Sequence, residues 1–469
     1  MALTIEQNPL YTLNPVGQEV IFTVSDLTTV GAYFNVKYVA EVHISTVDID
    51  LATTTAIVGT FKTTPNNTGV GMYDFRPILE SFVSPDNLAA LGSKYKGDLT
   101  TAIKTHPLHL VDKYSLNDNV VRYLKIRFTI EGSTTATGTV APIVGSEDDS
   151  VQYTLINGYL KYTDVINRDA TGNFGFNTEI FQLGGGATGN QLLTNAPTTQ
   201  YANINDYGTL SFMTTPKTGD VTNTTLDYFK IKLYDDSGSP LGTDIIIDNV
   251  DANGGNTTWD SATKNQLLHL GCFPANLKNW SSIFLANTTN LSYYLVEAFN
   301  ISDASISDRY TININCPTLK GYEPIRLTWL NQWGVWDYYT FKMKSTKMIS
   351  TKGSTYQQLE GTWNESIYLP NGYKGGKKAF RVNAMEKISM NTDFVNESES
   401  EWFEELINSP EVYILEGFQV DATLSSPNTY VTPARLTTSS YTRKTVANDK
   451  LMQYTFEVEK SKTLRTQSV

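Results

Sequence analysis

The sequence is poor in the residues that build metal and catalytic centres, with four histidines and two cysteines in 469 residues. Cys272 and Cys316 lie far apart and form no C-x-x-C pair, which predicts buried free thiols made in a reducing compartment rather than a disulfide framework. Charged residues make up only 18% of the chain, which excludes a coiled coil or a long helical rod. No apolar run reaches the length of about 18 residues that a membrane-spanning helix needs, so we expect none.

Positive charge is also scarce, and it is unevenly distributed. Residues 1–316 contain 18 Lys and Arg against 31 Asp and Glu, a net charge of −13, whereas residues 317–469 contain 18 against 17, a net charge of +1. Phosphate backbones and anionic lipids need clustered cations, so we expect neither nucleic acid nor a membrane as a partner. The first residues lack the cationic and apolar regions of a signal peptide, so we also expect no secretion signal.

The dominant pattern that is present is the alternation of apolar and polar residues. Residues 36–44, 123–130 and 228–234 each place apolar side chains at every second position. This period indicates half-buried strands of antiparallel sheets. The sequence therefore predicts a mainly β protein, with two consecutive antiparallel β-sandwich domains at residues 1–171 and 172–316. A mixed β domain with one or two short helices is expected at 317–469.

Two segments instead have helical spacing. Residues 74–83 carry apolar side chains three and four positions apart, and so do residues 398–407. The second segment begins with several glutamates, and Ser398 or Ser400 is the expected N-cap. No repeat of about 20–50 residues is visible, which argues against solenoids and propellers.

A zinc site is the first candidate for chemistry. His106 and His109 lie close together in the sequence, as do His269 and Cys272, and the four would suit tetrahedral zinc if the two segments met. Loop histidines usually hydrogen-bond carbonyl groups, and a cysteine beside leucine and glycine usually packs as a small hydrophobe. We therefore expect no metal and no cofactor.

Catalysis by carboxylates is the second candidate. Asp337, Glu360, Glu365 and Glu386 lie among Trp and Tyr residues, as the acids of a sugar-cleaving groove would. Acidic residues are common on any surface, however, and the chain lacks the G-x-S-x-G motif of a serine nucleophile. We expect no catalytic residues and a protein that is not an enzyme.

Residues 327–341 form the most informative stretch, because aromatic side chains crowd it around an expected turn at residues 331–334. We expect some of these rings to stay exposed and to serve as anchors for a neighbouring protein. A carbohydrate platform or a well-filled aromatic core are the alternatives. The expected interface residues are Trp329, Trp333, Trp336, Tyr338, Tyr339, Lys342 and Lys344.

Several short, distinctive segments are spread as islands along most of the chain: Asn14-Pro15 with residues 20–25, residues 36–42, Gly69-Val70-Gly71-Met72-Tyr73-Asp74-Phe75-Arg76-Pro77, Thr194-Asn195-Ala196-Pro197, Trp336-Asp337-Tyr338-Tyr339, and Ser409-Pro410-Glu411-Val412-Tyr413 with Tyr441-Thr442-Arg443-Lys444. In these islands the chain resembles structural proteins of the tailed-bacteriophage virion. The resemblance implies a component of the tail, baseplate or neck, assembled in the host cytoplasm.

That resemblance also implies the partners, namely other virion structural proteins and copies of the chain in a ring or another symmetric assembly. It implies no catalytic residues. A receptor-binding protein that recognises a host surface glycan is the alternative. A glycan depolymerase fits less well, because the short repeats of a parallel β-helix are missing from the sequence.

Overall fold

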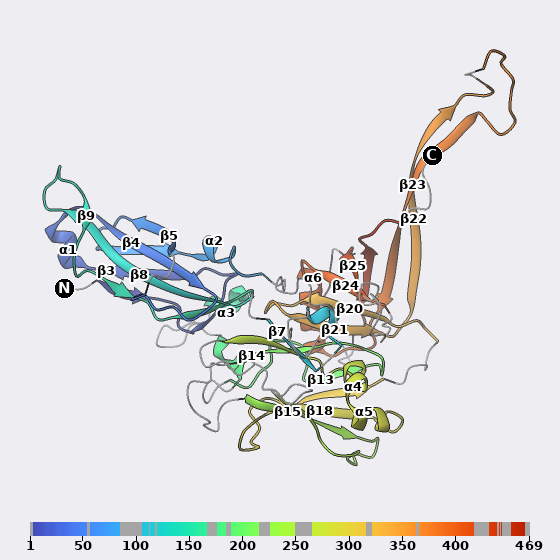
Figure 1. The fold of residues 1–469 in the computed structure, drawn as a ribbon, viewed down its shortest axis with the longest axis horizontal. Coiled ribbons are helices and arrows are strands. Elements are labelled where there is room, and N and C mark those ends of the chain that lie inside the picture. Colours follow the sequence, from blue (N-terminus) through green and yellow to red (C-terminus); the bar gives the residue numbers. More distant parts are fainter. Residues whose placement is uncertain are drawn as a thin grey trace. The chain divides into compact units, whose positions relative to one another are not determined.

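The computed structural model describes residues 3–53, 57–84, 106–111, 113–117, 120–166, 176–183, 189–214, 226–248, 265–315, 321–362, 365–416, 431–438, 440, 442 and 452–464. The fold is mainly β, with 46% strand and 13% helix, as the alternating sequence predicts (Figure 1). The chain divides into two compact units. Residues 1–315 with Leu330–Asp337 form the first, and residues 316–329 with Tyr338–Val469 form the second.

The expected domain borders lie outside the described residues. The border near 171 falls in the range 167–175, and the one near 316 falls in 316–320, so both borders stay predictions. The division of the chain at residues 315 and 316 is nevertheless the place where the net charge changes sign. Both expected sandwiches therefore belong to the first unit.

The first sandwich packs two sheets face to face through the alternating apolar side chains of their strands. Phe22 and Phe128 come from opposite sheets, are fully buried, and have ring centres 5.8 Å apart. The smaller sheet has the order β1 (Thr4–Gln7), β3 (Ile21–Ser25), β6 (Val70–Asp74). The larger has the order β2 (Leu13–Pro15), β11 (Tyr153–Ile156), β8 (Arg122–Ser133), β4 (Phe34–Ser45), β5 (Ile57–Thr63), with β9 (Ala141–Pro142) and β10 (Asp148–Asp149) also paired to β8.

Short helices connect these strands. The helix α1 (Leu27–Ala32) begins at Asp26, whose carboxylate accepts a hydrogen bond from the Thr29 backbone N–H at 3.0 Å. The helix expected at 74–83 is shorter in the structure, where α2 spans only Arg76–Leu79. Asp74 instead ends strand β6 and pairs with Ile21, so sheet pairing takes the first residues of the expected helix.

The second sandwich is built in the same way, with Phe212 of one sheet 4.7 Å from Phe229 of the other. One sheet has the order β12 (Gln182–Leu183), β14 (Leu210–Thr214), β17 (Gln266–Leu270), β7 (Tyr114–Asn117). The other has the order β13 (Thr199–Ala202), β19 (Tyr310–Ile314), β18 (Tyr293–Asn300), β15 (Leu226–Tyr234), β16 (Ile245–Asp248). The helical segments of this region are η2 (Pro107–His109), α3 (Tyr162–Ile166), η3 (Thr178–Phe181), α4 (Pro274–Trp280) and α5 (Ser282–Asn287).

Two details differ from the expected pair of sequential antiparallel sandwiches. Strand β7 comes from the segment expected in the first sandwich, yet it pairs with β17 in the second. The pairs β2–β11, β12–β14 and β13–β19 are parallel. Alternation along one strand reports which face is buried, but it carries no information on the direction or identity of the neighbouring strand.

The second unit contains one sheet with the order β21 (Trp336–Phe341), β20 (Ile325–Leu330), β24 (Val412–Leu415), β25 (Val431–Leu436), β26 (Thr455–Lys460), β23 (Gly376–Asn391), β22 (Ser345–Gln358). The helix α6 (Glu397–Asn408) packs on this sheet through Trp402, 4.9 Å from Trp329, and through Phe403, 5.5 Å from Phe456. These contacts explain the apolar stripe of the expected helix.

The N-cap of α6 differs from the expected one. The Asn396 carbonyl oxygen Oδ1 accepts a hydrogen bond from the Glu399 backbone N–H at 2.8 Å, and the Glu399 carboxylate accepts one from the Asn396 N–H at 2.9 Å. This is a capping box, and it leaves Ser398 and Ser400 inside the helix. The prediction of a serine cap is therefore wrong, because Asn396 makes both bonds of the cap.

Candidate interaction site

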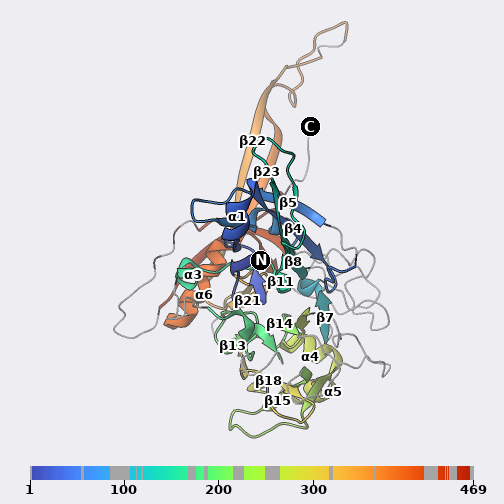
Figure 2. The same cartoon turned by 90° about the vertical axis from the view of Figure 1, so that its left-hand side faces the viewer.

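The described structure contains one long strand pair that leaves its sheet, which we call the arm: β22, β23 and the residues between them, 345–391. In β23 only Lys387–Asn391 pair with β26, whereas Gly376–Glu386 pair with β22, apart from one isolated bridge between Ala384 and Leu464. Both views show the two strands running side by side, and Figure 1 shows them leaving β24 and β25 of the same sheet (Figures 1 and 2). Among the described residues the arm therefore has no second layer of its own.

Apolar side chains are exposed on both faces of the arm. Met348 and Ile349 follow each other along β22, so they point to opposite faces, and they are 55% and 63% exposed. Phe380 is 54% exposed and its ring lies 6.4 Å from that of Tyr356. Further exposed apolar residues of the arm are Leu359, Ile367, Tyr368, Leu369, Tyr373 and Val382.

The end of the arm is folded on itself rather than open. The Thr362 N–H donates to the Leu369 carbonyl at 3.2 Å, and the Thr362 hydroxyl donates to the Ile367 carbonyl at 2.6 Å. Gly361 has a φ of +77°, and an added Cβ there would lie 2.5 Å from the Leu369 carbonyl oxygen. Ile367 and Leu369 thus stay exposed while their backbones are held in place.

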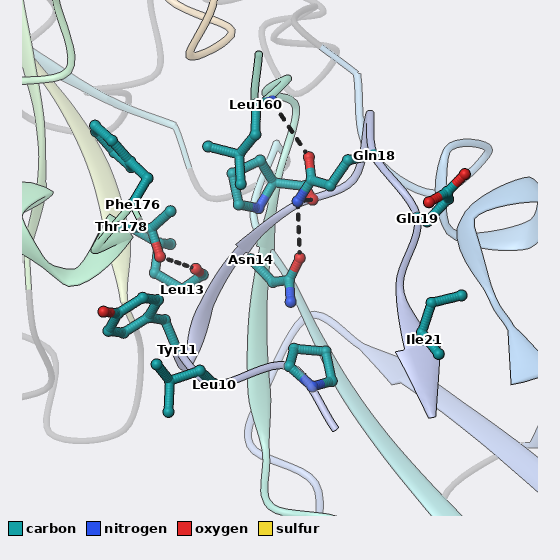
Figure 3. Close-up of a pocket in the computed structure, with 12 residues that line it drawn as sticks. Leu10, Tyr11, Leu13, Asn14, Gln18, Glu19, Ile21, Leu160, Phe176 and Thr178 are labelled. Atoms are coloured by element: carbon teal, nitrogen blue, oxygen red, sulfur yellow. Dashed lines mark hydrogen bonds between the residues drawn. The ribbon is translucent and has the colours of Figure 1, made fainter. Parts of the chain in front are cut away.

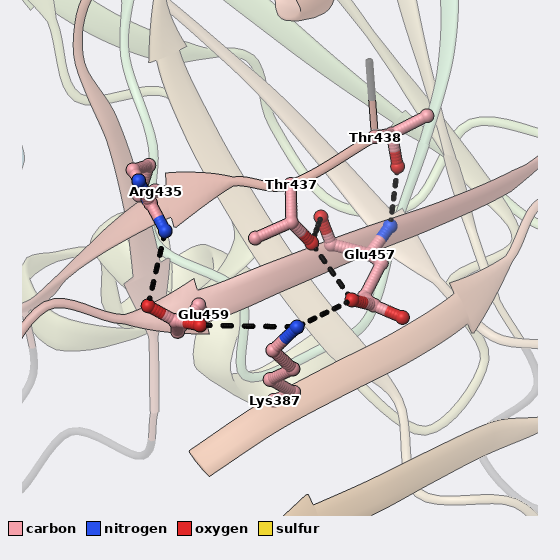
Figure 4. Close-up of polar contacts among 6 residues, drawn as sticks. All are labelled: Lys387, Arg435, Thr437, Thr438, Glu457 and Glu459. Atoms are coloured by element: carbon pink, nitrogen blue, oxygen red, sulfur yellow. Dashed lines mark hydrogen bonds and ion pairs between the residues drawn. The ribbon is translucent and has the colours of Figure 1, made fainter. Parts of the chain in front are cut away.

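A polar network joins the base of the arm to the rest of the sheet (Figure 4). The Lys387 ammonium lies 3.5 Å from a Glu457 carboxylate oxygen and 3.9 Å from one of Glu459, which also pairs with Arg435 at 3.2 Å. The Thr437 hydroxyl donates to Glu457 at 2.9 Å. The network therefore links β23, at the base of the arm, to β25 and β26 of the same sheet.

A second ion-pair group lies at the same base. The Lys460 ammonium is 2.8 Å from Glu416 and 3.2 Å from Glu386. Burial lowers the Lys460 pKa, but the hydrogen bonds and charges of Glu416 and Glu386 outweigh it and hold that pKa above its ordinary value. The base is thus built from satisfied charges, whereas the remainder of the arm is exposed.

Most of the expected interface residues lie elsewhere and are buried. Trp329, Trp333 and Trp336 are at most 2% exposed and Tyr338 is 5% exposed. The expectation that their rings stay exposed is wrong, because these side chains fill cores of the chain itself. Tyr339 is half-buried against Phe403, at 4.9 Å between ring centres.

The turn at 331–334 belongs to the first unit and is enclosed by other residues of that unit. The Trp333 ring lies 4.5 Å from Phe181, and its Nε1 donates to Asn195 Oδ1 at 3.1 Å. Asn331 Oδ1 accepts from the Trp333 N–H at 3.0 Å. Gly334 has a φ of +75°, and an added Cβ would lie only 1.8 Å from the Asn157 carbonyl oxygen. The expected turn exists, but its tip is enclosed.

The two expected interface lysines differ in their surroundings. Lys342 is half-buried and pairs with Asp393 at 3.2 Å, whereas Lys344 is exposed just before the arm begins. The exposed cations of the arm itself include Lys352 and Lys377. The signal that the sequence analysis missed is the weak alternation of residues 345–358, in which Ser, Thr and Lys leave no continuous apolar face to bury.

The four candidate carboxylates lie in separate places in the described structure and are not paired with one another. Asp337 is buried in the first unit, where it accepts a hydrogen bond from the Thr194 hydroxyl at 2.8 Å. Glu360 and Glu365 are exposed in the loop of the arm, and Glu386 pairs with Lys460. Asp337 and Glu386 therefore each bind another side chain, and Glu360 and Glu365 lie on the surface.

The histidine candidates lie in the first unit, where His269 is buried and His106 and His109 are half-buried. His106 and His109 have ring centres 6.2 Å apart, and His269 Nδ1 lies 2.7 Å from the Ser211 hydroxyl. Burial raises the pKa of the free Cys272 thiol to about 12, which makes this thiol inert. Among the residues that the structure describes, no group of three or more His, Cys, Asp or Glu is placed to hold a metal ion. Cys316 lies outside the described residues.

A small pocket opens in the first unit (Figure 3). Its volume is about 60 Å³, far below the roughly 300–1,000 Å³ of small-molecule sites. Gln18 spans one side and donates hydrogen bonds to Asn14 Oδ1 and to the Pro15 carbonyl. Its lining is mainly apolar and includes a single carboxylate, Glu19. The pocket therefore offers neither the space nor the paired acids of a hydrolase site.

Comparison with known proteins adds no assignment. No family model matches the chain, and no curated protein matches it. Within the described parts of the chain, every helix is too short or too polar to span a membrane.

Proposed function

We propose that this protein is a non-enzymatic structural component of a tailed-phage particle, in the tail, baseplate or neck, and that it binds neighbouring virion proteins. The observation that carries the proposal is the arm. A lone two-stranded ribbon is marginally stable in water, and a long unpaired edge invites pairing with other chains. A strand pair that exposes Met348, Ile349 and Phe380 is suited to a partner that covers it.

The sequence islands support the same proposal, since they resemble virion structural proteins. The acidic charge of the chain and its buried, unreactive Cys272 suit a protein that stays soluble in a reducing host cytoplasm until it enters the virion. On this proposal its partners are other virion proteins and further copies of itself.

Quantitative mass spectrometry of gradient-purified particles tests the proposal. We expect a fixed number of copies per particle, which resists a high-salt wash. Detection of the protein in infected cells but not in purified particles would contradict it. A parallel cryo-electron microscopy map would show whether density for the arm lies against a neighbour.

Binding of a host surface glycan is a second candidate, favoured by two exposed tyrosines near the end of the arm. Tyr368 and Tyr373 are 57% and 74% exposed, and aromatic rings of this kind stack on sugars. A glycan array probed with the full chain and with the Tyr368→Ala, Tyr373→Ala double variant distinguishes the two candidates. Glycan binding that the double variant loses would favour the receptor-binding alternative.

A further inference from the structure

We infer that the arm docks on the acidic first unit of a second copy of this chain, so that copies join head to tail. The inference deepens the proposed function and rests on it, because it names the neighbour that the arm contacts. It is argued from the edge, the exposed faces and the charge of the arm.

The outer edge of the arm offers backbone groups for pairing. In the described part of the chain β22 pairs with β23 alone along all 14 of its residues. Strands at sheet edges are usually kept short or carry prolines, lysines or bulges. The strand β22 is long and has no proline, while Lys347, Lys352 and an irregularity at Ser354–Thr355 leave the remainder of its edge open to pairing. An extended segment of a neighbour can therefore add to this edge.

The faces of the arm require a partner with apolar as well as polar contacts. Ile349 and Val382 are exposed by 63% and 42%, and Phe380 by 54%. Exposed apolar side chains on both faces of a ribbon are best covered by a cleft or by two surfaces of a neighbour. At the base of the arm, Lys387 pairs with Glu457 and Glu386 pairs with Lys460, so ion pairs join the ribbon to β26.

The net charge of the arm indicates which surface it binds. Residues 349–385 contain five cations, Lys352, Lys374, Lys377, Lys378 and Arg381, against two acids, Glu360 and Glu365, a net charge of 5 − 2 = +3. Two arms would repel each other, so pairing of arm with arm is disfavoured. Residues 1–316 carry a net charge of −13. The first unit of another copy is thus the complementary surface that the chain itself supplies.

Exposed acids lie near an edge of the second sandwich. Asp244 directly precedes the edge strand β16, and Asp236 lies in the segment between β15 and β16. Contact between different surfaces of identical chains is heterologous, and it closes into a ring or continues as a filament. Both results suit a repeated component of a particle.

Self-association of the purified full chain tests the inference, measured by sedimentation velocity at about 50 mM and about 500 mM NaCl. We expect oligomers that dissociate at the higher salt. The Lys352→Glu, Lys377→Glu variant changes two exposed arm residues and should weaken association by about tenfold or more. The matched control, Lys344→Glu with Lys462→Glu, changes two exposed lysines of the same unit outside the arm and should weaken it by less than about twofold.

Zero-length cross-linking of mixed unlabelled and ¹⁵N-labelled chains identifies the contact. We expect mixed-isotope cross-links between arm lysines and acids of the first unit. Cross-links only within one chain, cross-links between two arms, or a chain that stays monomeric at every salt and concentration would overturn the inference. If the protein is a virion component but its arm cross-links to another virion protein in purified particles, the inference fails while the proposed function stands.

Discussion

At the scale of single residues, the aromatic side chains of this chain divide into buried rings of the core and exposed rings of the surface. The aromatic cluster at 327–341 combines rings in two cores, and the Trp333 ring contacts Phe176 and Phe181 at 5.3 and 4.5 Å. The most exposed aromatic rings lie elsewhere, and they include Tyr373 in the arm. Replacing a buried ring should therefore lower the stability of the fold, whereas replacing an exposed ring should not.

Replacing Trp333 with alanine should lower the free energy of unfolding by about 3–5 kcal/mol, since it removes a buried indole and its hydrogen bond to Asn195. Denaturant unfolding followed by fluorescence measures this change. The control Tyr373→Ala, at a side chain 74% exposed, should change stability by less than about 0.5 kcal/mol. Equal effects of the two substitutions would contradict the assignment of Trp333 to the core.

The buried His269 and the half-buried His106 make stability dependent on pH. Burial, with a smaller contribution from His106, lowers the pKa of His269 to about 3, and burial with the charge of His109 lowers the pKa of His106 to about 4. The unfolded chain takes up protons at its ordinary histidine pKa of about 6.5, whereas the folded chain does not. Stability should therefore fall as the pH drops below about 6.5, because protons bind to the unfolded chain before they bind to the folded one.

Unfolding curves at about pH 7.5 and about pH 5 check this sign. The His269→Asn variant has one buried titrating group fewer, so the difference between its two curves should be smaller than that of the unchanged chain. An identical pH dependence in both proteins would show that His269 does not contribute.

At the scale of elements, the N-cap of α6 is an asparagine, although the local sequence pattern predicts a serine. Asn396 and Glu399 make the reciprocal bonds of a capping box, while Ser398 donates to Asn396 Oδ1 at 2.7 Å. The helix places Trp402 and Phe403 in the core of the second unit. Loss of the cap should therefore loosen the first turn without removing this packing.

The Asn396→Ala variant should lose about 1 kcal/mol of stability, and Ser398→Ala clearly less. Thermal unfolding of both variants provides the comparison. A larger loss for Ser398→Ala would restore the serine cap that the sequence predicts.

At the scale of the whole molecule, the arm is an appendage whose removal should spare the fold. Replacing residues 352–383 with Asn-Gly joins Thr351 to Ala384, which already pair across the ribbon, by a two-residue hairpin turn. It leaves the base pairing with β26 and the Lys387 network in place.

We expect this shortened chain to melt within a few degrees of the full chain and to bind less of a fluorescent dye that reports exposed apolar surface. Differential scanning calorimetry and dye titration measure the two quantities. A melting temperature lower by tens of degrees would show that the arm packs as core, and would also contradict its role as an exposed docking element.

The sequence by itself determined the features that depend on neighbouring residues along the chain. The alternation in residues 36–44, 123–130 and 228–234 predicted β4, β8 and β15, and the spacing in 398–407 predicted α6. Periodicity reports which side chains share a face, and this property is local. The mainly β class followed from it.

Only the tertiary structure decided what covers each face. The sequence of residues 331–336 is equally compatible with an exposed anchor and with a buried turn. Contacts with Asn157, Phe181 and Asn195, more than 130 residues away, bury the turn. Likewise, β22 is a strand whose Met348 and Ile349 stay more than half exposed in the described chain. Burial depends on contacts between segments that are distant in sequence, and a local pattern does not record them.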